Sequence, residues 1–255
     1  MPGSSLPRLK SMPLALIALL VVLLAGCASL APPPTVVAAF SGNPPDADAP
    51  RHWRPLIIHR AKAPTQYRLV YDENSRAVVV HARAERSASG LKQPLDVDPA
   101  IRPRVAWRWR VQDLIAGADN LDRHAEDSPV RLMLFFDGDK RRLPPRDQVA
   151  LDMAQMVSGQ EVPYATLVYL WENRQPVGTV IGSAHTGRIK MVVAGSGRDR
   201  LGQWKQFERD YVADFERAFG ERPGRLIGVG IMTDTDNTGA EIEAFYGDIE
   251  LRSAS

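Results

Sequence analysis

The chain has 255 residues and a formal net charge of +2, with one cysteine, 44% hydrophobic residues and 24% charged residues. These are the values of an ordinary globular protein, so they exclude a disordered chain, a collagen-like repeat, a disulfide-rich scaffold and a protein with many membrane spans. Any indication of function must therefore come from the order of the residues.

Residues 1–26 have the pattern of a secretory signal peptide. Arg8 and Lys10 precede an apolar stretch, 14–24, that ends in small residues. This stretch is shorter than the roughly 20 residues that a helix needs to cross a bilayer. The segment from Leu24 to Cys27 (LAGC) resembles the lipobox of bacterial lipoproteins, in which the peptide is cut before the cysteine and the cysteine carries lipid. The alternative is an ordinary signal peptide with a chance cysteine at its end.

Lipidation of Cys27 would have three consequences. Cleavage removes Arg8 and Lys10 and brings the formal net charge to zero, so the charge gives no reason to expect nucleic-acid binding. The mature protein has no free thiol, which excludes disulfides and cysteine–zinc sites. Ala28 and Ser29 follow the cysteine, and the resemblance to lipoprotein sorting signals implies an outer-membrane anchor facing the periplasm.

We expect residues 27–52 to be a lipidated N-terminus and tether, and residues 53–255 to be one folded domain. The segment 31–50 is rich in proline, alanine and aspartate, which favours an extended chain, although Phe40 could begin a first strand. The remaining stretch of about 200 residues is long enough to bury a single core.

Apolar residues recur at every second position along most of this domain. Residues 67–71 and 78–84 predict a hairpin, and the segment 104–111 alternates valine and tryptophan with arginine. Further strands are predicted at 131–136, 164–171, 178–181, 188–194, 226–232 and 241–251. About nine short strands separated by turn residues predict a mostly antiparallel β-sandwich of jelly-roll type.

One amphipathic helix is predicted over Gln206–Phe219, where four aromatic side chains share a face and Gly220 follows as a stop signal. A weaker pattern predicts a short helix at 148–156. Gly228 and Gly230 leave one face of a strand without side chains, and we expect the amphipathic helix, rather than a ligand, to approach the backbone there.

No catalytic motif is present in the sequence. It has no nucleophile elbow, dinucleotide fingerprint, P-loop or paired-histidine zinc motif, and its five histidines are scattered. We therefore predict no catalytic residue, and the sequence favours a non-enzymatic role over an enzymatic one.

The segment 232–239 (MTDTDNTG) alternates oxygen-bearing side chains, as sites for hard cations do. It is not an EF-hand, because Phe245 stands at the twelfth position from Asp234. A hairpin turn with Asx-type hydrogen bonds is the main alternative, and contact with a polar ligand is another. If calcium binds, the candidate ligands are Asp234, Asp236, Asn237 and Asp248.

Arginines and aromatic residues are the other candidates for ligand contact. Four arginines between 102 and 110 would share the outer face of one strand, where they could hold an anionic glycan or an acidic partner. Pairing with acidic neighbours such as Asp96, Asp98, Glu126 or Asp127 is the alternative. Aromatic rings could stack on sugars, although most tryptophans of a sandwich lie in its core. The ligand-binding candidates are Trp107, Arg108, Arg110, Tyr164, Trp171 and Tyr246.

Five segments together resemble one bacterial family. They are 87–91 (SASGL), 107–109 (WRW), 163–167 (PYATL), 210–220 (DYVADFERAFG) and 232–239 (MTDTDNTG). The family is that of domain of unknown function 3047, found in secreted proteins and lipoproteins of Gram-negative bacteria, and the similarity extends over about residues 40–251. It implies an envelope protein without an established activity. Residues 246–249 are also similar to the last strands of carbohydrate-binding jelly rolls.

These observations lead to three hypotheses. The first is a non-catalytic binding domain for an envelope glycan, with calcium at the 234–238 loop. The second is a structural or partner-binding lipoprotein that uses the arginine face. The third is a hydrolase with a carboxylate pair such as Asp137 with Asp139, or Glu126 with Asp127, which would require two acidic side chains within about 10 Å across one cleft.

Overall fold

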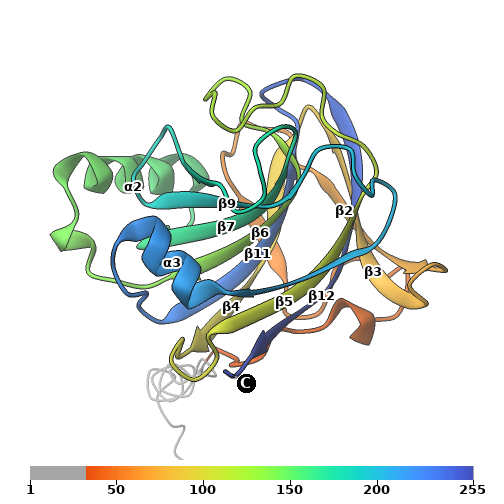
Figure 1. Ribbon diagram of the computed structural model, residues 1–255, viewed down its shortest axis with the longest axis horizontal. Coiled ribbons are helices and arrows are strands. Elements are labelled where there is room, and N and C mark those ends of the chain that lie inside the picture. The colour runs from red at the N-terminus through yellow and green to blue at the C-terminus, as the bar shows by residue number, and fades with distance from the viewer. Residues whose placement is uncertain (1–32, 255) are drawn as a thin grey trace, which may run out of the picture. The chain divides into compact units, whose positions relative to one another are not determined.

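The computed structural model describes residues 33–254, so the predicted signal peptide and Cys27 lie outside the described residues. Twelve strands in this part of the chain form two facing sheets (Figure 1). The predicted β-sandwich is therefore confirmed. None of the described helices has the length and apolar character needed to cross a membrane.

The larger sheet has seven strands in the order β1-β4-β11-β6-β7-β9-β8. Their bounds are Arg54–Ile57 (β1), Ala88–Val97 (β4), Leu226–Asp234 (β11), Ser128–Phe136 (β6), Ala165–Glu172 (β7), Ile189–Ser196 (β9) and Val180–Gly182 (β8). All neighbouring strands are antiparallel except β7 and β9, which are parallel.

The smaller sheet has five antiparallel strands in the order β10-β5-β12-β3-β2. Their bounds are Lys205–Asp210 (β10), Arg104–Val111 (β5), Glu241–Arg252 (β12), Ala77–Glu85 (β3) and Gln66–Asp72 (β2). Several neighbours are far apart in sequence, such as β4 beside β11 and β3 beside β12, in agreement with the predicted jelly-roll type.

The main core fills the space between the sheets, and a second apolar cluster covers the outer face of the larger sheet. Trp107 and Trp109 point inward from β5, and Trp107 stacks on Tyr169 of β7. On the other face of the larger sheet, Met133 and Phe135 of β6 join residues of β4, β7, β9 and β11. Because both faces are covered, every residue of β6 and β7 is buried, which explains their continuous apolar sequence.

Among residues 33–254, two α-helices lie outside the sheets. The predicted short helix is α2, Pro145–Ser158, and it is longer than expected. The amphipathic helix, α3, covers only Tyr211–Phe219, because Lys205–Asp210 pairs with β5 as an edge strand instead of forming the first turns. The side chain of Asp210 caps α3 by accepting a hydrogen bond from the Ala213 N–H, and Gly220 ends it in the left-handed conformation.

Two further expectations differ from the structure. The glycine stripe of β11 is covered by the Phe135 ring, which lies about 3 Å from where side chains would begin at Gly228 and Gly230, and α3 packs instead on Phe136 on the opposite face. The expected tether is shorter than 27–52, because Phe40, in a short 3-10 helix (η1, Phe40–Gly42), and Val37 are buried in the main core. Phe40 therefore begins no strand.

Candidate functional site

A cavity of about 300 Å³ opens over the outer face of the larger sheet, near the end of β11 and the start of β6. Its floor is apolar and consists of Ala88, Met133, Val168 and Met232, with Ile58 and Ile189 beside them. Its rim is polar and consists of Lys62, Arg123, His124, Glu126, Arg131, Ser183, His185, Asp234, Asp236 and Asn237. The cavity thus combines an apolar base with several hydrogen-bonding groups, as small-ligand sites commonly do.

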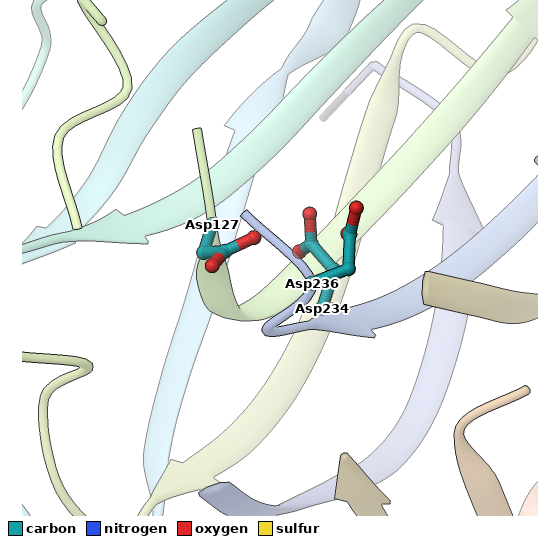
Figure 2. Close-up of side chains that lie close together, drawn as sticks. All are labelled: Asp127, Asp234 and Asp236. Carbon is teal, nitrogen blue, oxygen red and sulfur yellow. The ribbon is translucent and has the colours of Figure 1, made fainter. Parts of the chain in front are cut away.

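Three aspartates meet at the edge of this cavity (Figure 2). Asp127 directly precedes β6, Asp234 is the last residue of β11, and Asp236 follows in the turn to β12. The antiparallel register places Asp234 opposite Ser128, which brings the two strand ends together. One carboxylate oxygen from each aspartate lies within 4.8 Å of the others.

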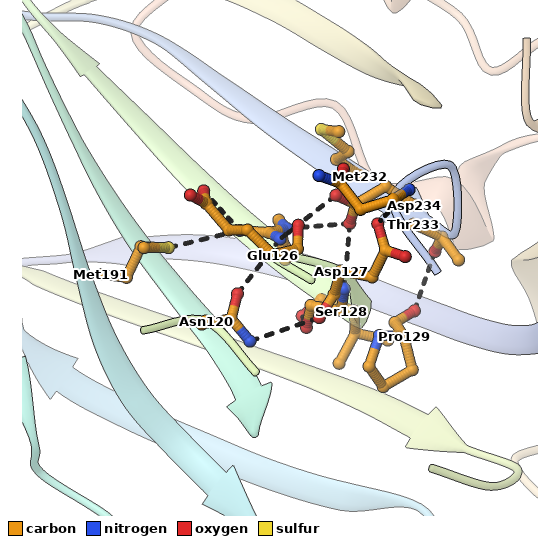
Figure 3. Close-up of polar contacts among 12 residues, drawn as sticks. Asn120, Glu126, Asp127, Ser128, Pro129, Met191, Met232, Thr233 and Asp234 are labelled. Atoms are coloured by element: carbon orange, nitrogen blue, oxygen red, sulfur yellow. Dashed lines mark hydrogen bonds and ion pairs between the residues drawn. The ribbon is translucent and has the colours of Figure 1, made fainter. Parts of the chain in front are cut away.

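Asp234 forms a buried, two-point ion pair with Arg131. The Nε–Oδ1 distance is 2.9 Å and the Nη2–Oδ2 distance is 3.1 Å, and each side chain is only 6% exposed. Arg131 also donates to the Asn120 side chain and to the Glu126 carbonyl oxygen (Figure 3). Burial raises the pKa of Asp234 to about 6, although the Arg131 guanidinium acts to lower it.

The other two aspartates are also engaged by the protein. Asp127 accepts hydrogen bonds from the backbone N–H groups of Asn237 (3.2 Å) and Thr238 (2.7 Å) and from the Thr238 hydroxyl (2.7 Å). Asp236 forms an ion pair with Lys62 from the loop that follows β1. The acidic cluster therefore ties the 236–238 turn to two other loops.

The predicted calcium ligands are only partly brought together. Asp234 and Asp236 are close, but the Asn237 amide group donates to the Arg123 carbonyl oxygen, and Asp248 accepts hydrogen bonds from Ser41 elsewhere. Asp248 therefore does not belong to this site, contrary to the sequence prediction. Calcium requires six to eight oxygen ligands, whereas the cationic side chains of Arg131 and Lys62 already contact two of the carboxylates. This donor set fits internal charge pairing better than a calcium ion.

Sequence reasoning did not find the partnership of Asp127 with Asp234, nor the contribution of Lys62, His124 and His185 to the rim. One signal was present: Arg131 begins the apolar run RLMLFF, and an arginine in a fully buried strand requires a buried partner. Nothing local in the sequence identifies that partner as Asp234, which lies 103 residues further along the chain.

The aromatic candidates do not lie on this cavity. Trp107, Trp171 and Tyr246 are buried, so the expectation that their rings form an exposed sugar platform is corrected. The Tyr246 hydroxyl donates to the Met232 carbonyl oxygen at 2.6 Å and supports the end of β11 from the core side. Tyr164 is partly exposed, but its hydroxyl contacts Glu221 near the end of α3.

The arginine row lies on the smaller sheet, away from the cavity, and has partners of its own. Arg110 is buried and pairs with Asp72 at 2.9 Å, and Arg104 pairs with Glu208 at 3.1 Å. Arg108 lies over the Trp204 ring, 5.1 Å from its centroid. Arg104 and Arg110 therefore pair with acidic side chains, as the alternative predicted, although their partners are not the residues expected.

Comparison with known proteins now supplies the family. The model of a family described as "Protein of unknown function (DUF3047)" matches residues 51–250. The chain belongs to this family. The suspected relationship is thus confirmed over most of the chain, and no curated protein matches it.

Among solved structures, the chain is similar to a β-1,2-glucanase from Parabacteroides distasonis, with 11% identity and a TM-score of 0.40 over 88% of this chain and 26% of the glucanase. It is also similar to the K3 adhesin domain of Lys-gingipain from Porphyromonas gingivalis w83, with 9% identity and a TM-score of 0.36 over 80% and 93% of the two chains. A third is the cellulose-induced protein Cip1, with 10% identity and a TM-score of 0.34 over 79% and 91%. The chain spans about a quarter of the glucanase's length, and these likenesses are too distant to assign a function.

Proposed function

We propose that this protein is an envelope lipoprotein, held at the outer membrane through lipid on Cys27, whose β-sandwich binds a cell-envelope glycan without catalysing a reaction. The observation that carries the binding role is the cavity on the larger sheet, with its apolar floor and polar rim. The LAGC segment supports the anchor.

The cavity has the chemistry that a sugar requires. Met133, Val168 and Met232 offer an apolar surface for the C–H face of a sugar ring. Around them, Lys62 and His124 can donate hydrogen bonds to sugar hydroxyls, and Glu126 and Asp236 can accept them. Because Lys62 and Asp236 neutralise each other, the rim can recognise a neutral polar ligand.

Hydrolysis is the second candidate function, and one observation favours it: the acidic residues are clustered, and burial gives Asp234 a pKa of about 6. Such a pKa suits a general acid. However, the Asp234 carboxylate is bound at both oxygens by Arg131, and Asp127 is bound by the 237–238 turn. These contacts leave neither group free to exchange a proton with a substrate, so binding is the better-supported function.

A glycan array followed by titration calorimetry tests the binding role. Asp236→Asn removes the negative charge and replaces one acceptor oxygen at the rim with an NH2 donor, and we expect it to weaken glycan binding by about 10- to 100-fold, the value of a hydrogen bond to a charged group. Asp139→Asn is the matched control, because Asp139 also pairs with a basic residue but lies outside the cavity. Equal affinity of the Asp236 variant and the native chain, or no glycan bound at all, would contradict the proposal.

The same preparations separate binding from hydrolysis. Release of new reducing ends from a bound glycan by the native chain would establish the hydrolase instead. For the anchor, mass spectrometry of the membrane-extracted protein should show a lipid-modified N-terminal cysteine, and Cys27→Ser should abolish that modification. An unmodified cysteine in the mature protein would refute the anchor while leaving the glycan test unaffected.

A further inference from the structure

The outward face of α2 carries four exposed apolar side chains alongside the exposed Arg146, Asp152 and Gln155. Val149, Met153, Met156 and Val157 are 57%, 60%, 78% and 37% exposed, respectively. They are spaced by four, three and one residues, which places them on one side of a helix. Single exposed apolar residues are ordinary on protein surfaces, but four that share one side of a helix are the kind of grouping that marks an interaction site.

The opposite face of α2 is fixed against the body of the protein by polar contacts. Asp147 is buried and accepts hydrogen bonds from the Thr186 hydroxyl at 2.9 Å and from the Gly187 N–H at 2.8 Å. Leu151 and Ser158 are buried on the same side. Because the polar anchor points inward, the helix cannot turn its methionines and valines toward the core, and Figure 1 shows α2 at the left edge of the molecule.

A cluster of basic residues precedes this apolar face. Lys140, Arg141 and Arg142 form a short 3-10 helix (η2), and Arg146 lies in the first turn of α2. The Arg141 side chain is almost fully exposed and pairs with the nearby, exposed Asp139. An apolar helix face beside exposed basic residues is complementary to a bilayer with anionic headgroups, because the side chains enter the acyl boundary while the basic groups contact phosphates.

We propose that α2 and η2 form a membrane-docking surface that lies in the plane of an anionic lipid bilayer. The position of Pro33, where the described residues begin, supports a bilayer at this surface if Cys27 carries lipid as proposed. A hollow of about 730 Å³ is lined both by Pro33 and by Gln160 and Glu161, which follow α2. Five residues, 28–32, lie between Cys27 and Pro33, and the six steps from Cys27 to Pro33 can span at most about 20 Å, so the anchor would hold this side of the domain near the bilayer.

Site-specific fluorescence tests the proposal. In the full chain carrying Cys27→Ser, no other cysteine remains, so Met153→Cys can carry a single polarity-sensitive label. Leu121→Cys is the matched control, because Leu121 is 61% exposed and Met153 is 60% exposed, but Leu121 lies in the loop between β5 and β6 instead of α2. With vesicles of phosphatidylglycerol and phosphatidylcholine, we expect a blue shift at position 153 and none at position 121. The apolar residues 14–24 could bind both labelled variants to the vesicle, but only a label that itself enters the bilayer should show a blue-shifted emission.

Charge reversal provides the second measurement. Lys140→Glu with Arg142→Glu should lower the partition of the 153-labelled protein into anionic vesicles by about fivefold or more per residue, and phosphatidylcholine vesicles alone should give little shift. No shift at 153, or equal shifts at 153 and 121, would overturn the proposal. A shift that grows with protein concentration without vesicles would instead show that α2 joins two copies of the chain. Because the labelled variants lack Cys27, a negative result in this experiment would refute docking by α2 without bearing on the proposed lipid anchor.

Discussion

The ion pair between Arg131 and Asp234 gives the sharpest test of the site's structure. Arg131→Met keeps the length of the side chain but leaves Asp234 as an unpaired, buried carboxylate close to Asp127. It also removes the donors that Asn120 and the Glu126 carbonyl oxygen now use. Removing one partner of a buried pair costs about 3–5 kcal/mol in the free energy of unfolding, and we expect a loss of that size at pH 7.5.

The pH dependence of this loss follows from the pKa of Asp234. That pKa, about 6 in the folded protein, lies above the ordinary value of 3.8, so the folded state binds the proton more tightly than the unfolded state. Protonation of Asp234 therefore stabilises the folded protein below about pH 4. This contribution to the free energy of unfolding, roughly 3 kcal/mol, is lost as the pH rises through about 6. Without Arg131 the pKa should rise further, because the opposing positive charge is gone. The variant should consequently recover stability in mild acid.

Urea unfolding followed by tryptophan fluorescence, at pH 5 and at pH 7.5, measures both effects. The double variant Arg131→Met/Asp234→Leu should be more stable than the single variant, because neither partner is then left charged and buried. Arg141→Met, which breaks an exposed pair with Asp139, is the control and should not change the midpoint measurably. A single variant as stable as the native protein, or one equally destabilised at both pH values, would refute this account.

Other parts of the fold give further predictions that thermal or urea unfolding can measure. Phe215→Ala should cost about 3–5 kcal/mol, because this fully buried ring packs on Phe136 with centroids 4.7 Å apart; a cost below 1 kcal/mol would contradict that packing. Asp210→Ala should cost about 1 kcal/mol through loss of the α3 cap, and Asp210→Asn should restore most of it. Gly90→Ala should lower the melting temperature, because its new Cβ would collide with the Ile231 carbonyl oxygen. Adding calcium should leave the melting temperature unchanged, and a shift of several degrees would restore the calcium hypothesis.

Much of the fold was predictable from local sequence patterns. The alternation in 67–71, 78–84 and 104–111 corresponds to β2, β3 and β5, and the apolar run 131–136 lies within β6. Gly220 marked the end of α3 correctly. These features are local, since backbone preferences and side-chain periodicity depend on residues only a few positions apart.

The start of α3 shows where local patterns fail. Phe207 has the helical spacing of four residues from Tyr211, which predicts a helix from Gln206. However, the edge of β5 offers unpaired backbone groups, and pairing with them gives Gln206–Asp210 its strand conformation. Likewise, Ala88–Val97 shows little alternation that a sequence prediction could use, but it becomes β4 because β1 and β11 pair with it on both sides. In both cases the deciding hydrogen bonds come from distant parts of the chain.

The candidate site depended even more on tertiary structure. The sequence by itself determined the strand pattern, the lipobox-like segment and the acidic character of the 234–237 turn. Only the folded chain decided that Asp127 and Arg131 meet that turn, that Trp107 and Trp171 are buried, and that the apolar face of α2 points outward. The physical reason is that a residue's charge and periodicity are local properties, whereas its burial and its partner depend on which distant strands, loops or helices pack beside it.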